Sequence, residues 1–212
     1  LQAAEGLLND ARSMAQDLKD VWEERRIAAS LGEVAWRLGD AGVAADQWEQ
    51  ALAFYRQRGD TSRRLLLSRN LARARAATGD LKAAEDLTHE QLELAHTEER
   101  FALEADAALR LALLQLRQGY PSQAKVHLDR VLELDGYLEE RGELQRAIAW
   151  MAYEQGQFEL AMTTQMRLPR DANGALSAYD AAFLAVFQAA RGEGRRLPLP
   201  HEPGYRDPAA TP

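Results

Sequence analysis

The sequence predicts an all-α fold, an α-solenoid of about ten helices arranged as antiparallel pairs, and three observations support this class. Alanine, leucine, glutamate, glutamine and arginine dominate, while β-branched residues are sparse, so helix propensity is high along most of the chain. Apolar residues recur at steps of three and four, as on one buried helical face. One unit also recurs along the chain at intervals of about 36 to 40 residues. A unit this short cannot bury its own apolar face, so the units must stack on each other.

Each recurring unit is marked by a glycine, with an aliphatic residue eight positions before it. In the first four units an alanine follows five positions after the glycine. Glycine tolerates the left-handed conformation that ends a helix, so a tight turn is expected after the first helix of each pair. The marking residues are the glycines Gly39, Gly79, Gly119, Gly156 and Gly192, the aliphatics Leu31, Leu71, Leu111, Ile148 and Leu184, and the alanines Ala44, Ala84, Ala124 and Ala161.

The ten expected helices follow this register. The first helices of the pairs carry the aliphatic stripe and end before a glycine, and the second helices carry the alanine. The earliest helix is a second helix, because Ala4, Leu8 and Ala11 stand one unit before Ala44, Trp48 and Ala51 in the same register. Asp20, Asp60 and Thr97 are the expected N-caps. The expected ranges are about 2–18, 21–38, 42–57, 62–78, 82–95, 98–118, 122–134, 138–155, 158–168 and 175–191.

Two segments follow from this register, a helical-repeat domain at 1–192 and a proline-rich tail at 193–212. Five of the seven prolines lie in the tail, from Pro198 onward, where they remove backbone donors and favour an extended course. The domain starts within the second helix of a repeat. Its face at Leu7, Leu8 and Met14 is therefore expected to be uncovered and is a candidate for self-association.

The composition restricts the classes of function. The net charge is −7 and charged residues make up 28 %, which argues against nucleic acid as a partner, because nucleic-acid binders usually carry a basic stripe. The chain has no cysteine, so disulfides and thiolate zinc sites are excluded. It has no apolar run long enough to span a membrane. We expect a cytoplasmic location and leave the periplasm and secretion open.

The pattern of paired helices, a Gly-Asp turn, small residues at the crossing and a large residue in the second helix resembles the tetratricopeptide repeat family. The match is best at Leu31-Gly32, Ala44, Trp48 and Ala51, and the frame covers about residues 4 to 192. The units are longer than the usual repeat of that family, which has about 34 residues, and the family's closing proline is absent. The resemblance implies a right-handed solenoid of the variety with units of about 40 residues, as in scaffold and regulatory proteins, with first helices that line a concave groove.

The groove that the resemblance implies would combine arginine side chains with an apolar and aromatic wall. Such a surface suits a partner peptide or helix with acidic and apolar side chains, because arginine makes forked contacts to carboxylates and aromatic residues act as anchors. The candidate partner-binding residues are Trp36, Arg69, Arg73, Leu109, Leu113, Arg146, Trp150 and Tyr153.

The arginines and leucines of unit-to-unit contacts also have a purely structural interpretation. Arg69 and Arg73 could pair with Glu33 and Asp106 on adjacent helices, where exposed ion pairs contribute little stability. The leucines at 109, 113 and 116 could be core residues. Trp150 and Tyr153 are expected to be exposed, because Ile148, Met151 and Ala152 already supply the buried side of their helix.

Neither catalysis nor a cofactor is expected. His89, Glu93 and His96 share a helical face, but a polar surface stripe is the simpler interpretation than a metal site. No nucleophile–base arrangement or phosphate-binding glycine loop is visible. The sequence therefore predicts a non-catalytic protein–protein interaction module, a scaffold or adaptor. The alternative is a regulatory sensor domain of a larger protein that binds a small ligand or its own proline-rich tail.

Overall fold

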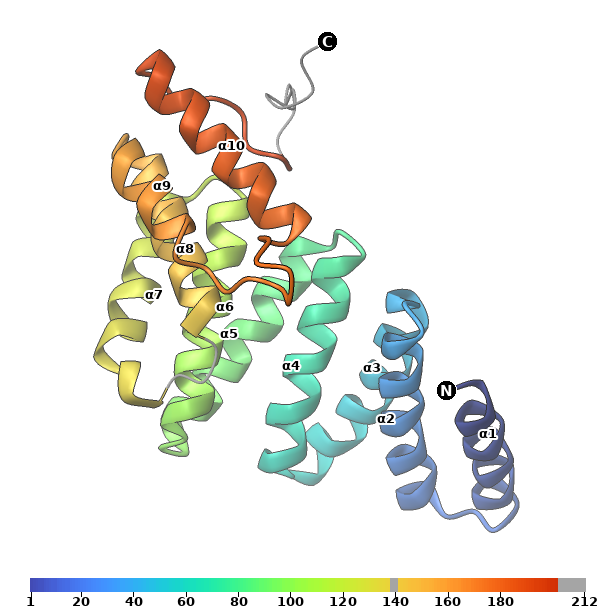
Figure 1. Cartoon of the computed structure of the whole chain (residues 1–212). Coiled ribbons are helices and arrows are strands. Elements are labelled where there is room, and N and C mark those ends of the chain that lie inside the picture. Colours follow the sequence, from blue (N-terminus) through green and yellow to red (C-terminus); the bar gives the residue numbers. More distant parts are fainter. Residues whose placement is uncertain (138–140, 202–212) are drawn as a thin grey trace. The chain divides into compact units, whose positions relative to one another are not determined.

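The computed structural model describes residues 1–137 and 141–201, which form ten α-helices, one 3₁₀-helix and no strand (Figure 1). The prediction of an all-helical chain whose consecutive helices pack as neighbours is confirmed. The chain divides into two compact units, Leu1–Ala107 (unit 1) and Ala108–Pro212 (unit 2), with the boundary inside helix α6 (Phe101–Arg117). Among the described residues, no helix is long and apolar enough to cross a membrane.

Unit 1 contains five complete helices and the start of α6. The five pack consecutively, α1 on α2, α2 on α3, α3 on α4 and α4 on α5. Their ends fall within about three residues of the expected ranges. The helices are α1 (Gln2–Asp17), α2 (Val21–Arg37), α3 (Ala41–Arg58), α4 (Thr61–Ala77) and α5 (Leu81–Thr97).

Helices α2 to α5 all begin with an aspartate cap. The carboxylates of Asp20, Asp40, Asp60 and Asp80 each accept a hydrogen bond from the backbone N–H three residues later, at 3.0 to 3.2 Å. This bond satisfies one of the donors that a helix start leaves without an internal partner. The expected caps at Asp20 and Asp60 are confirmed.

The expected cap at Thr97 is wrong. Thr97 is the last residue of α5, and its hydroxyl donates to the carbonyl of Glu93 at 2.8 Å. The turn that follows places Glu99 at a φ of 53°, and α6 starts only at Phe101. Helix α5 therefore extends two residues further than the pattern indicates.

The core of unit 1 contains a close contact between helices α2 and α3. Trp48 is buried, and its indole Nε1 donates to the carbonyl of Ala29 at 3.1 Å. A Cβ atom added to Gly32 would lie only 2.5 Å from that same Nε1. The glycine of the predicted Leu-Gly pair therefore leaves the space that the indole fills.

The outer face of α1 is partly uncovered, as the register predicts. Leu7 is 71 % exposed and Met14 is 66 % exposed. Leu8 instead is half-buried and packs with Ala11 against Ala15 and the aliphatic residues of α2. Self-association through this face stays a prediction.

Unit 2 contains the rest of α6 and four further α-helices. Helix α9 packs against both α8 and α10, and α7 contacts α8. The expected start of the eighth helix, at 138, lies outside the described residues, which resume at 141. The elements are α7 (Pro121–Glu133), the 3₁₀-helix η1 (Asp135–Tyr137), α8 (Arg141–Glu154), α9 (Phe158–Gln165) and α10 (Ala178–Glu193).

The glycine turns of the register are present except at the last position. Gly39, Gly79, Gly119 and Gly156 all have a positive φ, between 74° and 89°. Gly192 lies inside α10 instead, and the helix ends in a left-handed cap at Gly194. After that cap the chain runs without helix or strand to residue 201.

Candidate functional site

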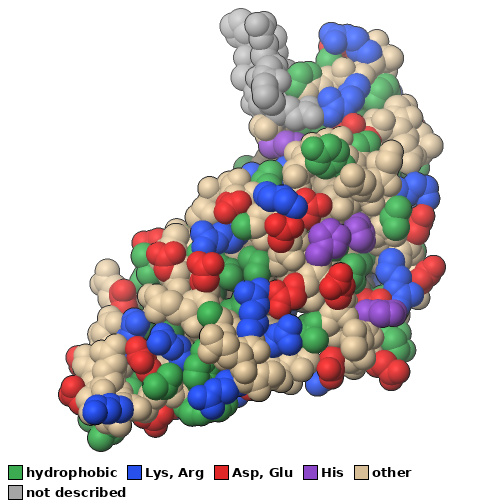
Figure 2. Space-filling view, turned by 180° about the vertical axis from the view of Figure 1, so that it is seen from behind, with side chains coloured by type: hydrophobic (Ala, Val, Ile, Leu, Met, Phe, Trp, Pro, Cys, Tyr) green, Lys and Arg blue, Asp and Glu red, His purple; other side chains and the backbone are tan. Residues whose placement is uncertain are grey.

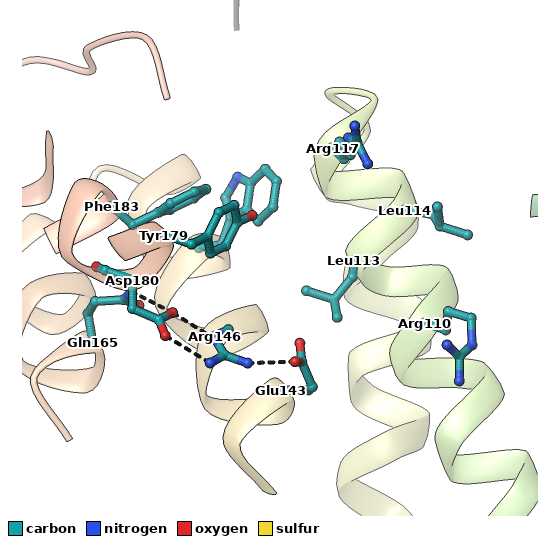
Figure 3. A pocket seen from close by; sticks show the side chains of 11 residues that line it. Arg110, Leu113, Leu114, Arg117, Glu143, Arg146, Gln165, Tyr179, Asp180 and Phe183 are labelled. Atoms are coloured by element: carbon teal, nitrogen blue, oxygen red, sulfur yellow. Dashed lines mark hydrogen bonds and ion pairs between the residues drawn. The ribbon is translucent and has the colours of Figure 1, made fainter. Parts of the chain in front are cut away.

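Unit 2 holds a cavity of about 210 Å³, lined by side chains from α6, α8, α9 and α10 (Figure 3). Its apolar lining comes from Leu113, Leu114, Trp150 and Phe183, and the ring of Tyr179 adds an aromatic face. Figure 3 shows Leu113 pointing from α6 toward the side chains of α8 and α10. A hydrophobic side chain of a ligand would find partners on more than one helix here.

The polar lining of the cavity carries one positive charge in excess. Three arginines and two carboxylates face it, together with the amide of a glutamine. Arg117 is exposed, and among the described residues no carboxylate pairs with it. The cavity therefore combines apolar side chains with a cation open to an acidic group. The polar residues are Arg110, Arg117, Glu143, Arg146, Gln165 and Asp180.

Arg146 is held rigidly on one side of the cavity. Its Nε and Nη2 donate to the two carboxylate oxygens of Asp180 at 2.7 and 2.8 Å, and Nη1 donates to Glu143 at 2.5 Å. These are the contacts drawn as dashed lines in Figure 3. The hydrogen bond to Asp180 raises the pKa of the Arg146 guanidinium above its usual value. The forked geometry fixes the guanidinium plane as well as its charge.

Asp180 is a buried carboxylate, only 1 % exposed. Ser177 caps α10 and donates its hydroxyl to Asp180 at 2.6 Å, and Gln165 donates to the backbone carbonyl of Asp180 at 3.0 Å. Burial raises the pKa of Asp180, but the hydrogen bonds from Arg146 and Ser177 outweigh it, so the net pKa lies below the usual value. Asp180 is therefore ionised at neutral pH and serves to position Arg146.

The structure brings only part of the predicted groove together in this cavity. Leu113, Arg146 and Trp150 line it. Leu109 is buried, only 3 % exposed, so its side chain belongs to the core.

The expected exposure of Trp150 and Tyr153 is wrong, since they are 5 % and 0 % exposed. Helix α10 and the segment after it cover this side of α8. The Trp150 ring lies 5.2 Å from Phe183, and the Tyr153 ring stacks on Phe187 at 4.7 Å, measured between ring centroids. Helix α8 is thus buried on both sides, which a single apolar stripe does not reveal.

The other predicted groove residues lie in unit 1, where they contact one another or α6. Arg69 Nε lies 3.3 Å from the carboxylate of Asp106, as the structural interpretation expects. The guanidinium of Arg73 stacks over the Trp36 ring at 5.1 Å from its centroid. Glu33 pairs with Arg37 of its own helix. Whether Trp36, Arg69 and Arg73 bind a partner stays a prediction.

Ion pairs within single helices are common on the surface. Lys82 pairs with Asp86 and Lys125 with Asp129, each four residues apart. The face drawn in Figure 2 shows acidic and basic side chains interspersed over most of its area. Such exposed pairs contribute little stability and no concentrated field of one sign.

The described residues contain no group of three or more histidines and carboxylates that could hold a metal ion. His96 instead lies 3.1 Å from the buried Glu104, and His89 lies 3.9 Å from Glu85. The two histidines thus face different carboxylates.

Sequence reasoning missed Asp180, Arg117, Gln165 and Phe183 as members of the site. A local signal for Asp180 exists, because Ser177 and Asp180 have the Ser-x-x-Asp spacing of a capping box at the start of α10. The pairing of Asp180 with Arg146, 34 residues earlier, has no local signal.

Comparison with models of known protein families finds no match, and comparison with curated proteins finds none either. The resemblance to tetratricopeptide repeats therefore rests on the residue pattern and on the pairing of consecutive helices.

Proposed function

We propose that the chain is a non-catalytic protein–protein interaction module, a scaffold or adaptor of tetratricopeptide type whose helix pairs form a right-handed solenoid. The cavity of unit 2 would receive a short partner segment with an acidic and an apolar side chain. The observation that carries this proposal is the joint presence of Leu113, Trp150 and Phe183 with the unneutralised Arg117 in one cavity.

The chemistry of the cavity supports binding over catalysis. An apolar side chain of the partner would bury against the aromatic rings, which are the usual anchors of peptide interfaces. A carboxylate of the partner would pair with Arg117, while Arg146 keeps its fixed place beside Asp180. The depressed pKa of Asp180 makes that carboxylate a poor proton acceptor.

The test is a selection of short peptides from a random displayed library on the full chain, followed by fluorescence anisotropy with the selected peptides. We expect enrichment of sequences that combine Asp or Glu with Leu, Phe or Trp. Arg117→Glu should weaken their binding by at least about tenfold, because it replaces an attraction with a repulsion.

The matched control is Arg167→Glu, which makes the same charge change on an exposed arginine outside the cavity lining. Arg167→Glu should leave the affinity unchanged. Equal losses in the two variants, or enrichment without acidic residues, would contradict the proposal. Arg73→Glu, measured in the same way, tests the predicted contribution of the Trp36, Arg69 and Arg73 patch of unit 1.

A second function, a regulatory domain that binds its own tail, is favoured by one observation. The ring of His201 lies 4.7 Å from Trp150 and 6.1 Å from Phe183, and both of these residues line the cavity. A ligand in the cavity and the tail would then affect each other through shared side chains. Leu199→Asp should shift the affinity of the selected acidic peptides, and an unchanged affinity would count against this second function.

A cytoplasmic location is part of the first proposal. Cell fractionation of the tagged chain tests it, and recovery in a secreted or periplasmic fraction would contradict it.

A further inference from the structure

The segment at 196–201, called the tail segment below, binds to α8 and α10 as an extended peptide would. The hydroxyl of Tyr153 donates to the carbonyl of Leu197 at 2.6 Å and accepts from the N–H of the same residue at 2.7 Å. One side chain thus satisfies both backbone groups of a residue that has no helix or strand partner. Contacts to the backbone hold an extended chain without regard to its side chains.

The residue before Leu197 adds a charged contact. Arg196 donates from Nε and Nη2 to the two carboxylate oxygens of Glu154 at 3.0 and 2.8 Å. The side chain of Glu154 is only 12 % exposed, and its carboxylate also accepts from the indole of Trp150 at 3.2 Å. The Arg196 guanidinium further lies over the Tyr153 ring, 5.8 Å from its centroid. A fixed carboxylate beside an aromatic face selects arginine over lysine, because only a guanidinium forks and stacks.

The residues after Leu197 supply the apolar contact. Leu199 is completely buried, while Pro198 and Pro200 on either side are half-buried. Proline has no backbone N–H, so these two positions bring no donor that must find a partner in the groove. Along the segment, Arg196 thus pairs with the carboxylate of Glu154, the backbone of Leu197 bonds to the hydroxyl of Tyr153, and the side chain of Leu199 is buried.

We propose that the groove between α8 and α10, built on Tyr153 and Glu154, is a binding site for extended proline-containing peptides of a partner protein with an arginine and two following leucines. The tail segment is its intramolecular competitor. This inference rests on the docking of the tail segment and is independent of the ligand proposed for the cavity.

The tail segment is a tethered ligand, so a free peptide has to displace it to bind. It follows the left-handed cap at Gly194 closely, and its polar contacts described above are one forked ion pair and one tyrosine hydroxyl. A short tether gives an effective concentration in the millimolar range, so a partner peptide must overcome that advantage. Weakening the tail segment should therefore reveal the site.

The experiment measures anisotropy of a fluorescent peptide that copies residues 194–201, added to the full chain. The release variant is Arg196→Glu with Leu199→Asp, and the matched control is Arg195→Glu, because Arg195 pairs with Glu193 outside the groove. We expect the release variant to bind the peptide at least about tenfold tighter than wild type, and the control to bind like wild type. Circular dichroism checks that helix content is equal.

A charge swap separates recognition from a structural effect. Adding Glu154→Arg to the release variant should remove binding of the peptide, and a peptide with glutamate at the Arg196 position should restore it. The proposal is overturned if the release variant binds no tighter than the control, or if the swapped peptide restores nothing.

If the release variant does not fold, a protease site inserted between Gly194 and Arg195 replaces it. Cleavage of the folded chain removes the tether, so diluted cleaved protein should bind the peptide tighter than uncleaved protein does. Unchanged binding after cleavage would overturn the proposal. So would a wild-type dimer, seen by sedimentation and dissociated by the peptide, because the occupant would then be the tail of a second copy.

Discussion

The two units start their helices in different ways. In unit 1, aspartate caps at Asp20, Asp40, Asp60 and Asp80 recur at equal intervals, and each begins a helix. In unit 2, the N-cap residues of α7 and α9 are Tyr120 and Gln157, which make no side-chain cap, and the interval between the register glycines shortens. Unit 1 thus has a regular series of caps from α2 to α5, and unit 2 departs from it at α7 and α9.

The irregular unit contains the cavity of the candidate site and the tail groove. Helix α9 has 8 residues, whereas α3 and α5 in unit 1 have 18 and 17. Gln165, where α9 ends, lines the cavity. The comparison teaches that both proposed binding sites lie in the unit whose repeat is less regular.

The largest expected loss of stability comes from substitution of Asp180. This carboxylate is buried and paired with Arg146, unlike the capping aspartates of unit 1. Asp180→Asn leaves the guanidinium of Arg146 without its forked carboxylate and should destabilise unit 2 by about 3 kcal/mol. Amide hydrogen exchange measured by mass spectrometry should show lost protection in α8 to α10 and none in α2 and α3.

The control for this prediction is Glu143→Gln, since Glu143 is the more exposed partner of Arg146. Removing its charge should lower the free energy of unfolding by less than about 1 kcal/mol. A similar loss of unfolding free energy in the two variants would mean that the burial of Asp180 does not determine how much the substitution destabilises unit 2.

Acid removes the same charge without a substitution. The pKa of Asp180 is lowered in the folded chain by Arg146 and Ser177, against the effect of burial. Its stabilisation is then complete above about pH 4, the usual value of an unfolded aspartate, and is lost as pH falls through the lowered folded value. Urea unfolding at a series of pH values should show a steeper acid loss in wild type than in Asp180→Asn. Parallel curves would contradict this assignment.

The next effect disturbs the regular unit at the close contact between α2 and α3. Gly32→Ala places a methyl group 2.5 Å from the Trp48 indole nitrogen and should destabilise unit 1 by about 2 kcal/mol. Gly6→Ala is the control, because nothing lies within 4 Å of its added Cβ and α1 should gain up to about 1 kcal/mol. Urea unfolding followed by circular dichroism measures both, and a stabilising Gly32→Ala would show that the two helices can move apart.

The sequence predicts the regular unit well because its signals are local. The aspartate that precedes a helix and the glycine that ends one both act within a few residues, so Asp20, Asp60 and the turn at Gly39 could be found by inspection. The cavity of unit 2 depends on Arg146 meeting Asp180 across 34 residues of chain. The burial of Tyr153 depends on Leu197, 44 residues away. Contacts at that separation leave no periodic trace, which is why the predicted exposure of Tyr153 is wrong.

The smallest expected effect exchanges the helix starts of the two units. Asp40→Ala removes the side-chain acceptor at the start of α3 and should cost about 1 kcal/mol in unit 1. Gln157→Asp installs an acceptor at the start of α9, where the backbone, at φ −86° and ψ 60°, lies near that of the Asp40 cap at −91° and 81°. The stability of unit 2 should rise by about 0.5 to 1 kcal/mol, because the new carboxylate would accept from a backbone donor that α9 leaves without a side-chain partner. Hydrogen exchange at the first turn of each helix measures both changes. If Gln157→Asp gains nothing, the irregularity of unit 2 lies in its backbone and not in the residues that start its helices.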